Sequence, residues 1–197
     1  MEEKEKVKKQ NFVIEAKNKD ILDSIKYAKR IQEAILPKAD DIYNILKNSF
    51  LLYKPKDIVS GDFYWFSEFE KYGKKQCIIA ACDCTGHGVP GAFMSLIGNE
   101  LLNQIVIEKN ITQPGEVLNQ LHAGVRFALR QYKEDAEVRD GMDIALCKVD
   151  QAEGILDFAV AHRPLYIFSP TSNGENQTES VYSEKVDLPQ GISFKEI

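Results

Sequence analysis

The chain has 197 residues, of which 44% are hydrophobic and 28% are charged, enough to bury one substantial core and carry an appended helix. Its formal net charge of −5 argues against nucleic acid as a partner, because binding to a phosphate backbone requires a basic surface. The sequence has neither a signal peptide nor an apolar run of about eighteen residues, so a cytoplasmic location is expected.

Residues 1–37 are expected to form a unit of their own. A charged lead over residues 1–16 either frays or continues a helix, and an amphipathic helix is predicted over residues 17–36, ended by Pro37. Its apolar positions recur at spacings of three and four: Ile21, Ile25, Ala28, Ile31 and Ile35. Such a narrow stripe favours a coiled-coil linker that joins two copies of the chain. Packing of the stripe against the chain's own domain is the alternative.

Residues 38–197 show the mixed pattern of an α/β (α+β) domain. Strands are predicted over residues 49–53, 63–69, 77–82, 142–149, 155–161, 164–169 and 180–186, with Asn173 and Gly174 as a hairpin turn. Two helices are predicted between the third and fourth strands, one beginning near Pro90 and one after Pro114. Their expected core faces are Ala92, Phe93, Leu96, Ile97, Leu101 and Ile105 on the first, and Val117, Leu118, Leu121, Val125, Ala128 and Leu129 on the second.

Four cysteines lie mostly in apolar, strand-like surroundings: Cys77, Cys82, Cys84 and Cys147. This setting predicts reduced core thiols. A single Cys-x-Cys pair without further ligands at suitable spacing is a weak signal for a soft metal, and a disulfide framework is not expected in a chain of this size.

Two aspartates in glycine-rich turns form the main candidate site. Asp62, in VSGDFY, opens one predicted strand, and Asp83, in DCTGHGVPG, closes another. Adjacent strands lie about 5 Å apart, so the two carboxylates can share a divalent cation, and oxygen ligands suit Mg²⁺ or Mn²⁺. Gly86, Gly88 and Gly91 would permit unusual backbone conformations and leave space for a phosphate. On spacing alone, Asp62 as a turn residue and Asp83 as a helix cap remain equally open.

Three segments carry a family resemblance: KPKDIVSGDFY at 54–64, DCTGHGVPGAFMS at 83–95 and DGMDIAL at 140–146. Together they closely resemble the SpoIIE/RsbU-type serine phosphatases of the metal-dependent (PPM, type 2C) superfamily. The resemblance implies an α-β-β-α sandwich. Relatives often carry such a linker helix between a sensor and the phosphatase, so the resemblance also implies an upstream sensor domain as the candidate membrane tether. It also implies two Mn²⁺ or Mg²⁺ ions bound by Asp62, Asp83 and the backbone carbonyl of Cys84, and attack on phosphoserine or phosphothreonine by a metal-activated water without a covalent phospho-enzyme.

The sequence departs from the family pattern in two places. Relatives have two further metal-binding aspartates near the C-terminus, which the residues after Asp187 do not supply. Residues 38–197 are therefore expected to be an incomplete phosphatase domain without its last strands, with weak metal binding and poor hydrolysis. The second departure is AVAHRPL at 159–165, where relatives commonly read AGANxPL. Val160 and His162 stand in place of a glycine and an amide there.

Other residues near the motifs have candidate roles. His87 is either a general acid or a brace for the glycine turn. Asp143 lies in a predicted strand, where a carboxylate needs a partner, and a metal-adjacent position is one option; Asp140 is interpreted as a turn residue. Gly86, Gly88 and Arg163 are candidates for contacting the substrate phosphate, although isolated surface cations are usually just solvated.

The preferred function is a protein-serine/threonine phosphatase domain of bacterial signalling, acting on a regulator such as a phosphorylated anti-sigma-factor antagonist. The alternative is a catalytically impaired, phosphatase-like module for dimerisation or interaction. A metal-independent hydrolase using His87 is disfavoured, because the sequence offers no nucleophile, base and orienting group as a set.

Overall fold

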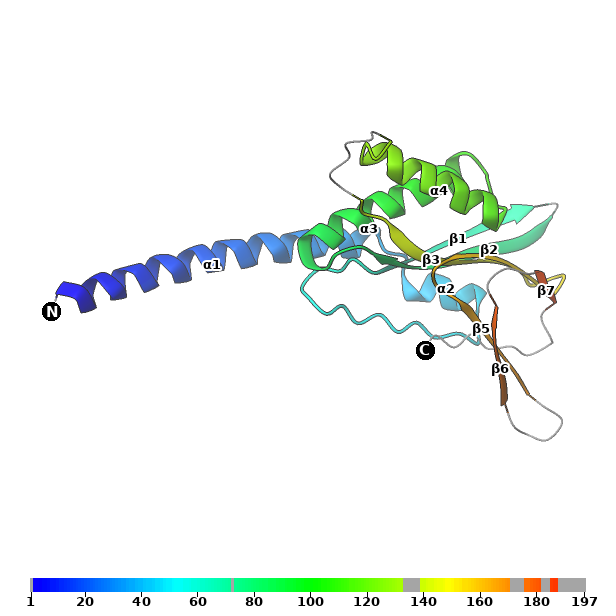
Figure 1. Cartoon of the computed structure of the whole chain (residues 1–197). Coiled ribbons are helices and arrows are strands. Elements are labelled where there is room, and N and C mark those ends of the chain that lie inside the picture. Colours follow the sequence, from blue (N-terminus) through cyan, green and yellow to red (C-terminus); the bar gives the residue numbers. More distant parts are fainter. Residues whose placement is uncertain (1, 72, 133–138, 171–175, 182–184, 188–197) are drawn as a thin grey trace.

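A computed structural model describes residues 2–71, 73–132, 139–170, 176–181 and 185–187. A long helix, α1 (Glu2–Ile35), projects from one end of a domain in which helices lie on a β-sheet (Figure 1). A short helix, α2 (Ala39–Ile45), follows and was not predicted from the sequence. The charged lead therefore continues the helix, and α1 ends two residues before Pro37, as the sequence predicts.

The main sheet is antiparallel, with the strand order β1-β2-β3-β4-β7. Its strands are β1 (Phe63–Lys71), β2 (Lys74–Cys84), β3 (Met142–Asp150), β4 (Ile155–Ala161) and β7 (Lys185–Asp187). A separate ribbon joins β5 (Leu165–Pro170) and β6 (Asn176–Val181). The predicted turn at Asn173 and Gly174 lies outside the described residues.

Two strand predictions need correction. Residues 49–53 form no strand. Their apolar alternation arises instead because Leu51 packs against the domain while Leu52 is exposed, and the Leu51 N–H donates to the hydroxyl of Tyr43. The single strand predicted over residues 180–186 is divided between β6 and β7.

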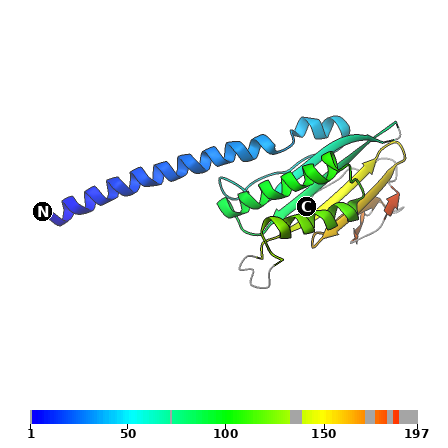
Figure 2. The ribbon, with the colours of Figure 1, turned by 90° about the horizontal axis from the view of Figure 1, so that it is seen from above.

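Helices cover one face of the sheet (Figure 2). They are α3 (Gly88–Leu102), a π-helix (Asn103–Glu108) that continues it, and α4 (Pro114–Ala128). Phe93 and Ala128, predicted to be core, are exposed. Ala128 is the last residue of α4. For Phe93, the reason is that α3 meets the sheet through small residues: a Cβ added to Gly98 would lie 2.8 Å from the Phe63 ring. Close approach of the helix thus turns the Phe93 side of α3 outward.

The opposite face of the sheet carries a second apolar cluster. Ile42 and Leu46, in and just after α2, pack there against side chains of β3 and β4, including Val149 and Phe158. All four cysteines are buried and free, which confirms the prediction of reduced core thiols. Alternation along β2 divides the two clusters, because Cys82 and Cys84 face the helices while Cys77 faces the α2 side.

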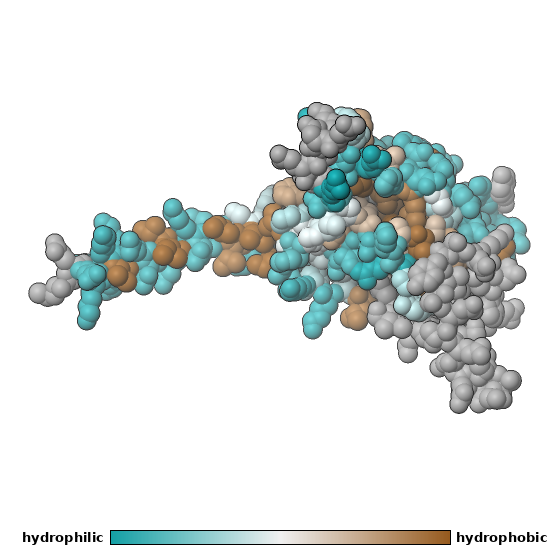
Figure 3. Space-filling model, viewed as in Figure 1, coloured by the Kyte–Doolittle hydropathy of each residue, from teal (hydrophilic) through white to brown (hydrophobic). Residues whose placement is uncertain are grey.

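The apolar stripe of α1 is largely uncovered. The exposed fractions are 58% for Ile21, 46% for Ile31 and 36% for Ile35, whereas Ile25 and Ala28 are half-buried. Apolar surface follows the projecting helix in the space-filling view (Figure 3). Packing of the whole stripe against the chain's own domain, the alternative considered from the sequence, is therefore wrong.

Candidate active site

Three aspartates lie at the same end of the β1–β2–β3 ladder. Phe63 pairs with Cys82, so Asp62, just before Phe63, and Asp83, just after Cys82, flank the same end of the β1–β2 pairing. Asp83 also pairs directly with Asp143 of β3. We call Asp62, Asp83 and Asp143 the aspartate edge.

Strand alternation gives the aspartate edge a definite face. Cys84 and Ile144 face the helices, so Asp83 and Asp143, their neighbours in the strands, point to the opposite face. Asp62 follows Gly61, where an added Cβ would lie 3.3 Å from the Cys84 carbonyl oxygen, so the Asp62 turn lies beside Cys84. Burial, and after it the charge of Asp62, raise the pKa of the Cys84 thiol to about 12. Asp83 lies inside β2, not just after its strand as predicted, and His87 takes the N-cap position of α3, so the helix-cap interpretation of Asp83 is wrong.

Three glycines bring the two motif loops together. A Cβ added to Gly61 would lie 2.6 Å from the carbonyl oxygen of Gly86. A Cβ added to Gly91 would lie 2.5 Å from the same oxygen and 2.8 Å from the Cα of Gly61. Real Cβ atoms do not approach backbone so closely, so these segments require glycine. The expectation that Gly91 leaves open space is wrong, because backbone fills that space.

His87, in the loop between β2 and α3, is held in place by Asp57, which lies before β1. Gly86 and Gly88 adopt positive φ angles of 84° and 62°, as the glycine pattern predicts. The Nδ1 atom of His87 lies 2.8 Å from a carboxylate oxygen of Asp57, and the imidazole makes no capping hydrogen bond to α3. His87 therefore braces the turn in this structure. Asp57 was assigned no role from the sequence, although it lies within the first motif.

Hydrogen bonds tie the end of β2 to the loop before β3. The Thr85 hydroxyl donates to the Asp140 carboxylate at 2.9 Å, and the Gly141 N–H donates to the Thr85 hydroxyl at 3.0 Å. The Thr85 N–H in turn donates to the Gly141 carbonyl at 3.0 Å. Asp140 thus has a structural role in holding this loop, consistent with a turn residue.

Arg163 forms an ion pair with Asp83. It follows His162, which has a left-handed backbone (φ 62°) and bridges to Ile144. Histidine is among the residues that tolerate this conformation better than most, so its presence in place of an amide does not prevent the turn. The interpretation of Arg163 as a merely solvated cation is wrong.

Gln32 connects α1 to the Asp62 turn. Its side-chain amide donates to the Ser60 carbonyl at 2.7 Å and to the Ser95 hydroxyl at 2.8 Å, and its carbonyl oxygen accepts from the Ser60 N–H at 3.0 Å. Gln32 is 4% exposed, on a helix whose other residues are otherwise solvated or half-buried where the structure describes their side chains. Gln32 was not among the residues predicted from the sequence, where its signal is a polar residue next to the apolar position Ile31.

Replacing Gln32 by alanine is expected to destabilise the domain by about 3 kcal/mol, because the Ser60 backbone groups would stay buried without partners. The measurement is the midpoint of urea unfolding, compared with Gln10→Ala on the exposed part of the same helix. Gln10→Ala should change stability by less than about 0.5 kcal/mol. Equal effects of the two substitutions would contradict the bridging role of Gln32.

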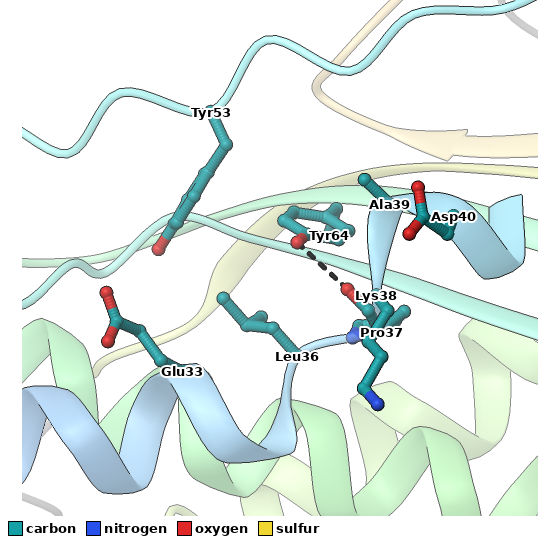
Figure 4. A pocket seen from close by; sticks show the side chains of 8 residues that line it. All are labelled: Glu33, Leu36, Pro37, Lys38, Ala39, Asp40, Tyr53 and Tyr64. Atoms are coloured by element: carbon teal, nitrogen blue, oxygen red, sulfur yellow. Dashed lines mark hydrogen bonds between the residues drawn. The ribbon is translucent and has the colours of Figure 1, made fainter. Parts of the chain in front are cut away.

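A hollow of about 430 Å³ lies where α1, α2 and β1 meet (Figure 4). Tyr53 and Tyr64 line it with an edge-to-face contact at a centroid distance of 5.3 Å, and Glu33 points into it from α1. The Tyr53 hydroxyl donates to the backbone carbonyl of Asp62 at 3.1 Å, and the Tyr64 hydroxyl donates to that of Pro37 at 3.0 Å. Burial raises the pKa of Tyr53. The hollow therefore borders the aspartate edge, and Tyr53 in its wall helps to hold the backbone of Asp62 in position.

The donor set suits a hard divalent cation in part. Asp62 and Asp83 supply carboxylates from neighbouring chain segments, and the Cys84 carbonyl lies beside them, 3.3 Å from where a Cβ on Gly61 would sit. Oxygen donors of this kind fit Mg²⁺ or Mn²⁺. Within the part of the chain that the structure describes, no three His, Cys, Asp or Glu side chains converge as a metal cluster. The described residues therefore provide part of a coordination shell.

Known proteins share this sequence pattern and this fold. The sequence model of the family described as stage II sporulation protein E (SpoIIE) matches residues 73–193. The chain belongs to the SpoIIE family. A solved structure, the SiaA-PP2C domain of Pseudomonas aeruginosa, superimposes with a TM-score of 0.71 at 30% sequence identity, covering 88% of this chain and 70% of that chain. The search of curated proteins gave no match.

These findings confirm the predicted fold class. The chain is a SpoIIE-family, PP2C-like phosphatase domain, in which helices lie on an antiparallel sheet and a long helix precedes them. Among the described helices, none combines the length and the apolar character that a membrane span requires.

Proposed function

We propose that the chain is a metal-dependent protein-serine/threonine phosphatase domain whose reaction takes place at the aspartate edge. The observation that carries the proposal is the placement of Asp62 and Asp83 at the same end of the β1–β2 ladder, fixed by glycine contacts, in a SpoIIE-family chain. Family membership supports a phosphorylated regulatory protein, such as an anti-sigma-factor antagonist, as the substrate.

Each residue of the edge has a proposed part. Asp62, Asp83 and the Cys84 carbonyl would hold the cations, and Asp143 stands next to Asp83 as a further oxygen donor. Two bound Mn²⁺ or Mg²⁺ ions would neutralise the phosphoryl oxygens and lower the pKa of an attacking water. Gly86 and Gly88 are the proposed contacts for the substrate phosphate. His87, oriented by Asp57, is the candidate proton donor to the leaving alcohol.

A second candidate function rests on two other observations. The described donors provide only part of a coordination shell, and the α1 stripe is exposed. Both are compatible with a phosphatase-like module that serves dimerisation or interaction without turnover. The two candidates differ in one measurable property, which is chelator-sensitive hydrolysis.

The deciding experiment measures release of phosphate from a phosphoserine peptide, with and without Mn²⁺ and with EDTA. The proposed function predicts turnover that requires Mn²⁺ and stops on chelation. Turnover that persists in EDTA would exclude the metal mechanism. Mn²⁺ binding without turnover would favour the interaction module.

The exposed stripe of α1 predicts a homodimer. Sedimentation should give twice the 22.3 kDa chain mass, because an exposed apolar seam on a long helix associates with its like. The double substitution Ile21→Ser with Ile31→Ser should give the monomer mass, and it leaves Gln32 intact. The matched control is Lys9→Ser with Lys19→Ser on the same helix, which should stay dimeric. A monomeric parent chain would refute the prediction.

A further inference from the structure

One cation lies among the carboxylates of the aspartate edge. The guanidinium of Arg163 pairs with the carboxylate of Asp83, and their side chains are 50% and 40% exposed. Arg163 comes from the end of β4, and β3 lies between β4 and β2 in the sheet. The left-handed turn at His162 redirects the chain after β4, which lets the Arg163 side chain reach past β3 to Asp83.

We propose that Arg163 is an internal cation that competes with a divalent metal ion for the Asp83 carboxylate. The inference rests on the proposed function, since it assumes that Asp83 is a metal ligand. Asp83 and Asp143 stand directly opposite each other, and like charges so placed repel. A cation at this position reduces that repulsion whether or not a metal is present. The guanidinium supplies that cation from within the chain.

Charge makes the two cations competitors. Arg163 contacts one of the two oxygens of the Asp83 carboxylate, and a divalent ion bound to the same carboxylate would lie close to the guanidinium and repel it, so the guanidinium is expected to move away when the metal enters. Its half-exposed position lets it do so. Partly exposed ion pairs are weak, so Arg163 lowers the metal affinity without blocking the site. Once released from Asp83, the guanidinium stands next to the place where the substrate phosphate is proposed to bind.

The test is the affinity of the full chain for Mn²⁺, measured from the electron paramagnetic resonance signal of the free ion. Arg163→Gln is expected to bind Mn²⁺ about twofold to fivefold more tightly than the parent chain, which corresponds to the loss of an exposed ion pair. Arg163→Lys keeps the charge and is expected to fall between them. The matched control is Arg126→Gln on the exposed side of α4, which should bind as the parent chain does.

Two results would overturn the competition: equal or weaker Mn²⁺ binding by Arg163→Gln, or no measurable binding by either protein. A further variant separates this failure from that of the proposed function. Asp83→Asn should lose Mn²⁺ binding. If Asp83→Asn binds Mn²⁺ as the parent does, the metal assignment itself is wrong. If Asp83→Asn loses binding while Arg163→Gln matches the parent, only the role of Arg163 is wrong.

Discussion

Replacing Asp83 by asparagine is expected to lower kcat/KM for a phosphoserine peptide in Mn²⁺ by about 100-fold to 1000-fold. This corresponds to about 3–4 kcal/mol of lost transition-state stabilisation, because a neutral amide at a metal ligand position weakens both cation binding and phosphate alignment. The pairing of Asp83 with Asp143 and with Arg163 places it at the centre of the aspartate edge. Phosphate release at saturating and limiting peptide gives the two kinetic constants.

The matched control for Asp83 is Asp41→Asn. Asp41 is exposed in the first turn of α2, outside the aspartate edge, and its loss should leave kcat/KM within about twofold of the parent value. Thermal unfolding in EDTA should be similar for the Asp83 variant and the parent. An Asp83→Asn protein that retains full Mn²⁺-dependent activity would remove Asp83 from the mechanism.

Gly91→Ala is expected to destabilise the domain and to disturb the aspartate edge. The added Cβ would lie 2.5 Å from the Gly86 carbonyl oxygen, 2.8 Å from the Gly61 Cα and 3.0 Å from the Gly61 nitrogen. All three are backbone atoms, so no flexible side chain can yield. Overpacking of this kind costs about 1–3 kcal/mol, and it would also separate the Asp62 turn from the Asp83 loop. Urea unfolding measures the first effect and Mn²⁺ affinity the second.

Gly115→Ala provides the comparison for Gly91→Ala. Gly115 lies in the first turn of α4, and a Cβ added there meets no atom within 4 Å. Alanine favours a helix over glycine, so Gly115→Ala is expected to stabilise the chain by about 0.5 kcal/mol. If both variants unfold at the same urea concentration, the glycine contact has no energetic importance.

Local patterns in the sequence predicted much of the fold because they reflect local physics. Apolar alternation identified β1, β2, β3 and β4, and proline placed the starts of α3 and α4. The errors at Phe93 and in residues 49–53 arise because an apolar pattern does not say what a side chain packs against. Which face of a helix is buried depends on how close its partner lies, and small residues on α3 permit an approach that hydrophobicity alone does not encode.

The candidate site was predicted in part. The motif aspartates were identified from their glycine-rich turns, and the sheet register places them side by side. Gln32, Asp57 and the Arg163 partner could not be predicted, because each contact joins segments at least 28 residues apart. Such pairings follow from the folded topology, and a single sequence carries no signal of a polar side chain that becomes buried only on folding.

The reactivity of the buried cysteines can be used to measure how often the sheet opens. Burial raises the pKa of the Cys77, Cys84 and Cys147 thiols to about 12 and that of Cys82 well above its usual value. Since the thiolate is the nucleophile, the folded chain should resist alkylation and oxidation near neutral pH. Labelling therefore requires that the sheet open. The rate at which iodoacetamide modifies Cys84 would report how often the end of β2 that carries Asp83 opens away from the Asp62 turn, without any phosphorylated substrate.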